Sequence, residues 1–171
     1  MALIFNNVYL TTENKILKTA LDLSYDTDVI KDFSVPARVI LEQESPFLKS
    51  LMINKGSKND IMKGMSVFNK NFLLGTVIEV NYLTSRVLLL TDLNSKLPVI
   101  IENTDVNAIL AGEGKKSDLR LDYLPENYQL EENKIIFTSG KGGFIRAGIP
   151  VAKTYLNKDN EILIKLLADP N

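Results

Sequence analysis

The sequence contains no histidine, no cysteine and no tryptophan, and the first two absences each exclude a class of chemistry. Without histidine there is no Ser-His-Asp triad and no histidine-ligated metal site. Without cysteine there is no disulfide, no zinc-thiolate centre and no cysteine nucleophile. No apolar run approaches the roughly 18 residues that a transmembrane helix requires, and the N-terminal residues Met-Ala-Leu-Ile-Phe-Asn-Asn lack the basic flank of a signal peptide. The 171 residues are therefore expected to be soluble as given.

An excess of charge of one sign is also missing. Twenty basic side chains face twenty-one acidic ones, which leaves a net charge of -1. Proteins that bind nucleic acid or a membrane surface through polybasic segments usually carry a basic excess, so both classes are disfavoured. Hydrophobic residues make up 45% of the chain, enough to bury a globular core.

The chain contains one twelve-residue sequence pattern twice, at residues 56–67 and 140–151, and this pattern is here called the repeated phrase. Both copies read Gly, four residues, Ile, two residues, Gly, an apolar residue, one residue, Val. The pattern predicts a strand that ends at a glycine, a turn that uses positive φ, and a new strand. A phrase repeated at this distance indicates two related β modules. The glycines predicted to be structural turn residues are Gly56, Gly64, Gly75, Gly140, Gly143 and Gly148.

Residues 3–24 form the one long helix that the sequence predicts. Leu3, Leu10 and Leu17 are seven residues apart, and Asn7 and Asn14 then occupy the other core position of a coiled coil. An amphipathic helix lying on the rest of the domain is the alternative. We expect a helical arm over residues 1–30, a coiled-coil remnant that self-associates through Leu3, Leu10, Asn14, Leu17 and Leu21.

From Ser34 onward, short runs rich in β-branched residues alternate with turn residues. Eleven short strands without helices between them are typical of small barrels or sandwiches rather than a parallel βαβ sheet. The predicted fold is mainly β, with two small β-barrel modules at 34–105 and 106–168 and exchange of strands between them left open. The predicted strands cover 37–43, 48–54, 66–69, 73–82, 86–91, 97–102, 107–111, 119–124, 134–139, 149–156 and 161–167.

No constellation of residues supplies a convincing catalytic centre, and no cofactor is expected. Residues 138–143 have the glycines and lysine of a phosphate-binding loop, but a strand follows them where a P-loop opens a helix. Ser57–Lys58 and Ser139–Lys141 are the nominal Ser–Lys pairs, and both are expected in solvated turns. The carboxylates do not cluster as in a metal site. Large or charged residues at strand ends and in turns are the candidates for partner binding, namely Tyr123, Tyr128, Phe144, Ile145 and Arg146.

An ordered set of short stretches resembles the extracytoplasmic part of the rod shape-determining protein MreC family. None of the stretches is specific alone, but together with residues 13–17, similar to the end of the family's coiled coil, they cover residues 13–153 in the family's order. The stretches are Ile53-Asn54-Lys55-Gly56-Ser57, Lys63-Gly64-Met65-Ser66-Val67, Leu74-Gly75-Thr76-Val77-Ile78-Glu79-Val80, Thr84-Ser85-Arg86-Val87-Leu88-Leu89-Leu90-Thr91-Asp92, Ser95-Lys96-Leu97-Pro98-Val99, Ile109-Leu110-Ala111-Gly112, Tyr123-Leu124-Pro125, Thr138-Ser139-Gly140 and Gly148-Ile149-Pro150-Val151.

The resemblance implies a scaffold without catalytic activity in the bacterial cell-elongation machinery. It implies a periplasmic part of a single-pass inner-membrane protein whose anchor is absent from this chain. The implied partners are a second copy in a homodimer or larger assembly, the elongation-specific penicillin-binding transpeptidase that it binds and activates, MreD, RodA and the actin-like MreB, and no nucleic acid. Two other classes remain open: a periplasmic adaptor of an export system, which requires a long helical hairpin within a β module, and a Ser–Lys hydrolase.

Overall fold

The computed structural model describes residues 34–45, 48–70, 72–114, 118–141 and 145–168. These ranges contain eleven β-strands and one 3₁₀ turn, and no α-helix. The expected helical arm of residues 1–30 lies outside the described residues, together with the leucines and Asn14 assigned to self-association. The elements are β1 (Val39–Ser45), β2 (Leu48–Ile53), η1 (Ser57–Asn59), β3 (Ser66–Asn69), β4 (Phe72–Val80), β5 (Ser85–Leu89), β6 (Lys96–Ile101), β7 (Asn107–Gly112), β8 (Asp118–Asp122), β9 (Ile135–Thr138), β10 (Pro150–Leu156) and β11 (Ile162–Leu166).

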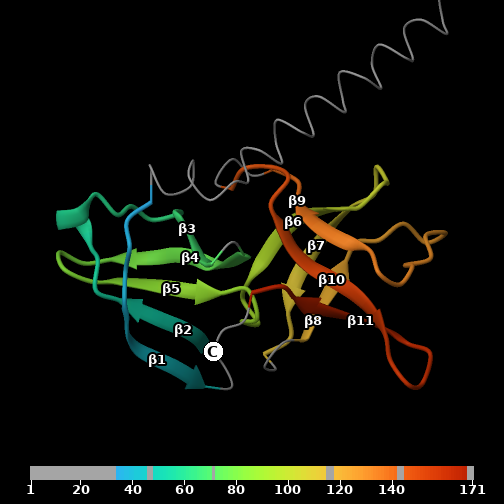
Figure 1. Cartoon of the computed structure of the whole chain (residues 1–171), viewed down its shortest axis with the longest axis horizontal. Helices are drawn as coiled ribbons and strands as arrows, with labels where there is room; N and C mark the ends of the chain where they lie inside the picture. The colour runs from blue at the N-terminus through green and yellow to red at the C-terminus, as the bar shows by residue number, and fades with distance from the viewer. Residues whose placement is uncertain (1–33, 46–47, 71, 115–117, 142–144, 169–171) are drawn as a thin grey trace, which may run out of the picture. The chain divides into compact units, whose positions relative to one another are not determined.

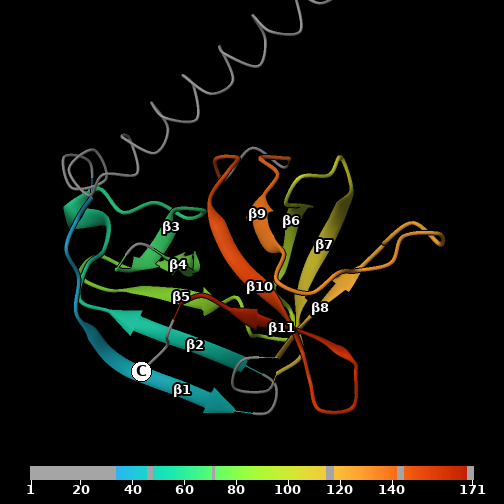
Figure 2. The same ribbon diagram turned by 45° about the vertical axis from the view of Figure 1, so that its right-hand side comes forward.

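The first five strands form an open antiparallel sheet in the order β1-β2-β5-β4-β3 (Figures 1 and 2). In β5, Ser85, Val87 and Leu89 are buried and the residues between them are partly exposed. This alternation arises because successive side chains of a strand point to opposite faces. The buried face joins a core that also contains Leu51 and Val77.

The last six strands close into a barrel in the order β10-β11-β8-β7-β6-β9 (Figure 2). Strand β9 completes it by pairing antiparallel with both β6 and β10. The interior is filled by apolar side chains, of which Val99, Ile136 and Val151 are 0% exposed. Closure leaves no strand of the barrel with a free edge.

The sheet and the barrel belong to one compact unit and pack against each other through β4. Leu73 lies in the core of the barrel, whereas the next residue, Leu74, lies in the core of the sheet. The connection after β5 is fixed by Asp92, which is 1% exposed. Its carboxylate accepts hydrogen bonds from the backbone N–H groups of Lys49 and Asn94, at 2.5 and 2.7 Å.

The structure confirms a mainly β fold with a barrel, and it corrects the prediction of two barrels. The first module is an open sheet, because β1 and β3 stand at its opposite edges. Phe68 of β3 and Leu73 of β4 pack into the barrel core, so the barrel covers apolar surface that closure of the sheet would otherwise have to bury. Strand β6 falls within the expected range 34–105 but pairs with the barrel strands β7 and β9.

Candidate interaction surfaces

The two copies of the repeated phrase form the same hydrogen-bonded corner in their second halves. Gly64 and Gly148 both have positive φ, at 92° and 85°. Each donates its N–H over 2.8 Å to a neighbouring strand, Gly64 to the carbonyl of Val77 and Gly148 to that of Thr138. Each of those strand residues donates back over 2.9 Å to the residue after the glycine. The glycines thus set equivalent turns just before β3 and β10.

The first halves of the two copies differ in backbone conformation. This difference, together with the position of Gly75, corrects part of the prediction of turn glycines. Gly140 has a φ of +73°, as predicted, but Gly56 has an extended φ of −142°. A side chain at Gly56 would collide with the carbonyl oxygen of Asn81, so this glycine is required by close approach of the backbone and not by its dihedral angle. Gly75 lies inside β4 rather than in a turn, where a side chain would meet the backbone of Leu88. Gly143 lies outside the described residues.

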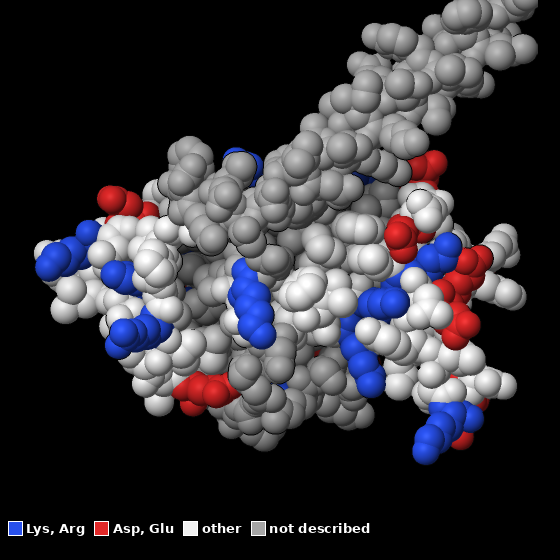
Figure 3. All heavy atoms as spheres, viewed as in Figure 1, with Lys and Arg blue, Asp and Glu red and all other residues white. Residues whose placement is uncertain are grey.

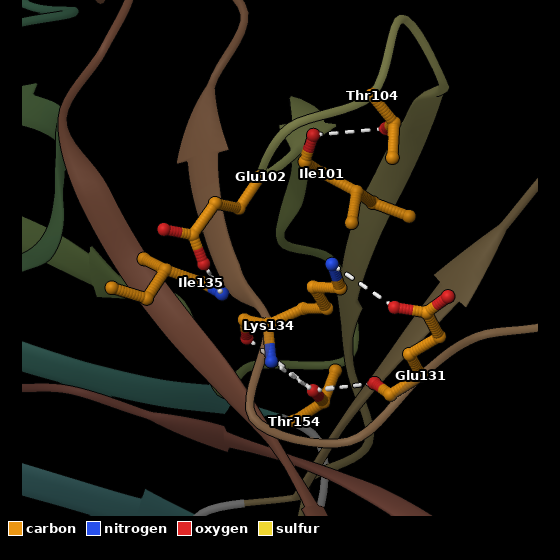
Figure 4. A network of polar contacts seen from close by, with 7 residues as sticks. All are labelled: Ile101, Glu102, Thr104, Glu131, Lys134, Ile135 and Thr154. Carbon is orange, nitrogen blue, oxygen red and sulfur yellow. Dashed lines mark hydrogen bonds and ion pairs between the residues drawn. The ribbon is translucent and has the colours of Figure 1, made fainter.

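A polar network holds the loop of residues 123–134 against the barrel (Figure 4). The hydroxyl of Thr154, which is 0% exposed, accepts from the N–H of Lys134 and donates to the carbonyl of Glu131, each at 2.8 Å. The carboxylate of Glu102 accepts from the N–H of Ile135 at 3.0 Å. The side chains of Lys134 and Glu131 form an ion pair at 3.0 Å, and this hydrogen bond to Glu131 raises the pKa of Lys134.

A second buried hydroxyl fixes the end of the loop of residues 139–149. Thr138 is 1% exposed, donates to the carbonyl of Arg146 at 2.5 Å and accepts from the N–H of Ile149 at 3.0 Å. Both buried threonines therefore have their hydrogen bonds committed to backbone groups. This is the arrangement of structural hydroxyls rather than of a nucleophile held beside a base.

The predicted partner-binding residues lie in two loops that are not brought together. Residues 123–134 precede β9 and residues 139–149 follow it, so the loops leave opposite ends of that strand. Tyr123 is 80% exposed and has a φ of 64°, which turns the chain directly after β8. Tyr128 is partly buried, and Ile145 packs against the barrel core. Arg146 is exposed, and Phe144 lies outside the described residues.

The structure assembles no catalytic or metal centre among the described residues. Ser57 and Lys58 are both exposed, and Lys141 is exposed with its backbone N–H, not its ammonium group, directed at the hydroxyl of Ser139 over 3.3 Å. A lysine can act as the base for a serine only where burial keeps its amine neutral and able to accept a proton, and these lysines are exposed. The described residues hold no cluster of acidic, histidine or cysteine side chains suited to a metal ion. No helix in the described part has the length and apolar character needed to cross a membrane.

Two exposed clusters were missed by reasoning from the sequence. On the outer face of the barrel, the ammonium groups of Lys153 and Lys165 lie 5.7 and 5.8 Å from the ring centre of Tyr155. Alternation along β10 places Lys153 and Tyr155 on one face, but Lys165 joins them only through the pairing of β10 with β11. At the turn between β4 and β5, Tyr82 and Leu83 are 67% and 57% exposed. The sequence had placed Tyr82 at the end of a strand.

Comparison with known proteins gives a consistent family. The family model described as "Rod shape-determining protein MreC, barrel core" matches residues 39–170. The cell shape-determining protein MreC of Caulobacter vibrioides is 34% identical over 160 residues, which cover 94% of this chain and 45% of that protein. The chain therefore spans less than half the length of this relative.

Solved structures agree with the fold. The crystal structure of MreC from Pseudomonas aeruginosa has a TM-score of 0.68 and 29% identity, covering 77% of this chain and 88% of that one. A chain from the complex between penicillin-binding protein (PBP2) and MreC from Helicobacter pylori has a TM-score of 0.57 at 16% identity, covering 77% of this chain and 84% of that one, and supports the fold alone. The match of the family model to the region that forms the sheet and the barrel, together with these relatives, places the chain in the MreC family of rod shape-determining proteins.

Proposed function

We propose that this chain is a non-catalytic scaffold of the bacterial cell-elongation machinery. The observation that carries the proposal is the family match over residues 39–170, the region that forms the sheet and the barrel. The use of the buried polar side chains supports it, because Asp92, Thr138 and Thr154 all hydrogen-bond to backbone groups of the chain itself. Such a molecule presents stable surfaces to partners.

The proposed partner is the elongation-specific penicillin-binding transpeptidase, which the chain binds and activates in the periplasm. A protein of the same fold occurs in a complex with a penicillin-binding protein, which supports this choice of partner. Tyr123 is the proposed contact in the first loop, because a largely exposed aromatic ring held at a fixed backbone angle is a suitable anchor. Arg146 is the proposed contact in the second loop. MreD, RodA and MreB are proposed as further members of the assembly.

Binding of the purified transpeptidase ectodomain to the immobilised chain tests this proposal. We expect Tyr123→Ala to weaken binding about tenfold or more, as truncation of an interface anchor does. Tyr155→Ala is the matched control, since Tyr155 is an exposed tyrosine on the side of the barrel. Absence of binding by the unaltered chain would overturn the proposal, whereas equal weakening by both variants would remove only the assignment to Tyr123.

Self-association is proposed to use the helical arm through Leu3, Leu10, Asn14, Leu17 and Leu21. Light scattering of the whole chain should give a dimer that dissociates when Leu10, Leu17 and Leu21 are replaced by polar residues. A monomer at high concentration in the unaltered chain would contradict this. We also propose that the chain is the periplasmic part of a single-pass inner-membrane protein. An apolar run of about 20 residues upstream in the parent sequence is the expected anchor.

The export-adaptor alternative gains no support. It requires a long helical hairpin within a β module, and the described ranges between residues 34 and 168 contain no α-helix.

A further inference from the structure

One end of the open sheet carries an exposed apolar apex, here called the sheet tip and defined as residues 54–65 and 81–84. Tyr82 and Leu83 occupy the two central positions of the β4–β5 turn and are 67% and 57% exposed. Met62, in the neighbouring segment, is 64% exposed. Turn centres usually hold glycine, asparagine, aspartate or proline. Two large apolar side chains at this position therefore require an explanation other than turn formation.

The apex is held firmly by its backbone. Asn81 donates its N–H to the carbonyl of Thr84 at 2.8 Å and closes the turn. The N–H groups of Ser57 and Lys58 donate to the carbonyls of Asn81 and Tyr82, at 2.9 and 3.1 Å. Gly56 permits this approach, because any larger residue would collide with the turn. Tyr82 and Leu83 are thus presented to solvent by a braced turn and are not side chains of a loose loop.

Basic residues outnumber acidic ones in the segments that form this apex. Arg38 is tied to the tip through Asn54, since the N–H of Arg38 donates to the Asn54 side-chain oxygen at 2.7 Å and the N–H of Asn54 donates to the carbonyl of Arg38 at 3.0 Å. In Figure 3, Lys and Arg atoms are prominent at the left end, where Figure 1 places the β4–β5 turn. The charged residues of the tip, with Arg38, are four basic and one acidic: Arg38, Lys55, Lys58, Lys63 and Asp60.

The nearest carboxylate on β4 does not cancel this charge. Glu79 is paired with Arg86 on β5 at 3.1 Å, so that pair is neutral as a unit. The net charge of -1 for the whole chain therefore conceals a local basic excess. This end of the sheet therefore carries the basic excess that favours an anionic membrane surface, although the chain as a whole does not.

The shape and size of the tip select the kind of partner. A specific protein interface buries at least about 1,200 Å² in total, and an aromatic side chain contributes only about 150–250 Å². Three exposed side chains at the sheet tip do not reach that area without a matching pocket in the partner. A lipid bilayer needs no pocket, and it favours tyrosine at the headgroup level, aliphatic groups below it and lysines beside anionic phosphates.

We propose that the sheet tip docks on a bilayer of anionic phospholipids, with Tyr82 and Leu83 entering the headgroup region. Lys58 and Lys63, both exposed, contact lipid phosphates around them. This inference stands on the tip alone and requires neither self-association nor binding of a transpeptidase.

The absence of tryptophan makes a direct test available. Tyr82→Trp places a single fluorescent reporter at the sheet tip of the 171-residue chain, and Tyr123→Trp places one at a still more exposed tyrosine directly after β8 of the barrel. Each protein is titrated with vesicles of phosphatidylcholine, with and without phosphatidylglycerol. We expect a blue shift of emission for Tyr82→Trp with the anionic vesicles and no shift for Tyr123→Trp. High salt should abolish the shift, because it screens exposed charges.

Charge variants in the Tyr82→Trp background complete the test. Replacement of Lys58 and Lys63 by glutamine should lower the apparent vesicle affinity roughly tenfold or more, since each lysine near an anionic surface contributes separately. Replacement of Lys153 and Lys165 by glutamine removes the same charge from the barrel face and should leave the affinity unchanged. No shift with anionic vesicles, equal shifts for the two reporters, or equal losses for the two pairs of lysines would each overturn the proposal. A shift induced by a protein partner but not by vesicles would also overturn it.

Discussion

The sheet and the barrel bury hydroxyl groups in opposite ways. In the barrel, Thr138 and Thr154 are 1% and 0% exposed, and each hydroxyl both donates to and accepts from loop backbone. In the sheet, Ser50 and Ser85 are 1% and 0% exposed, and among the described residues their hydroxyl oxygens have no hydrogen-bond partner.

The two regions therefore differ in the use of their buried hydroxyls, which hold loop backbone in the barrel and bind nothing in the described part of the sheet. A buried hydroxyl without a partner costs about 1–3 kcal/mol, so the sheet carries a cost that the barrel avoids. The barrel also has no free edge, whereas the sheet ends in the edge strands β1 and β3. The barrel is therefore the region in which buried hydroxyls support the two loops that we propose as partner contacts.

The substitution with the largest expected effect on stability tests whether the sheet and the barrel unfold together. Leu73 belongs to a strand of the sheet but is fully buried in the core of the barrel. Leu73→Ala should lower the free energy of unfolding by about 2–5 kcal/mol, through lost apolar burial and the cavity left behind. Urea denaturation followed by circular dichroism should give one transition, shifted as a whole.

Leu83→Ala is the matched control, because Leu83 is 57% exposed and its truncation leaves no cavity. Its stability should stay within about 0.5 kcal/mol of the unaltered chain. Two separate transitions in the Leu73→Ala protein, with only one of them displaced, would contradict the view that the sheet and the barrel share a core.

The next largest effect on stability is expected from removing a buried hydroxyl. Comparing one hydroxyl of the barrel with one of the sheet tests directly whether the two regions use them differently. Thr154→Val keeps the shape of the side chain but leaves the N–H of Lys134 and the carbonyl of Glu131 without their partner. The expected loss is about 1–3 kcal/mol. Ser85→Ala removes a hydroxyl that has no partner to lose, so it should be neutral or should stabilise the protein by up to about 1 kcal/mol.

Chemical denaturation of the two variants in parallel gives both values. A Thr154→Val protein as stable as the original, or a Ser85→Ala protein destabilised as much as Thr154→Val, would remove the distinction between the two regions.

Most of the strands could be predicted from the sequence, because each strand is bounded by turn residues and carries β-branched or alternating side chains. Closure could not be predicted in this way. Whether five strands curl into a barrel depends on pairing between β1 and β3, and on Phe68 and Leu73 finding the barrel core. Both are contacts between distant parts of the chain that no local pattern encodes.

The candidate surfaces show the same limit. Tyr123 follows a strictly alternating strand, so its place at a strand end could be read locally. Tyr82 and Leu83 lack the composition of a turn, and their exposure follows from Gly56 and Ser57 bracing the turn from another segment. Lys165 meets Tyr155 only through strand register.

A smaller effect on stability is expected from alanine substitutions in the two copies of the repeated phrase, one of which lies in each region. Gly64 and Gly148 have φ values of 92° and 85°, which are unfavourable for any residue with a side chain. Gly64→Ala and Gly148→Ala should each cost about 1–2 kcal/mol, and by similar amounts, because the corners are equivalent. Thermal unfolding of the two variants measures this. A cost at one glycine and none at the other would show that the copies share sequence without sharing a structural role.

The smallest effect concerns one surface ion pair from each region. Glu79→Gln in the sheet should change stability by about 0–1 kcal/mol, as exposed pairs usually do. In the barrel, the side chain of Glu131 is 68% exposed, so Glu131→Gln should lower stability only slightly at pH 7. Glu131 raises the pKa of Lys134, so the pair stabilises the folded state below the ordinary lysine pKa of about 10.4 and loses that contribution as pH rises through the raised value. Glu131→Gln should therefore flatten the alkaline end of the stability profile, while the neighbouring Glu132→Gln leaves it unchanged. An identical alkaline profile for both variants would assign the pair no role in holding the loop.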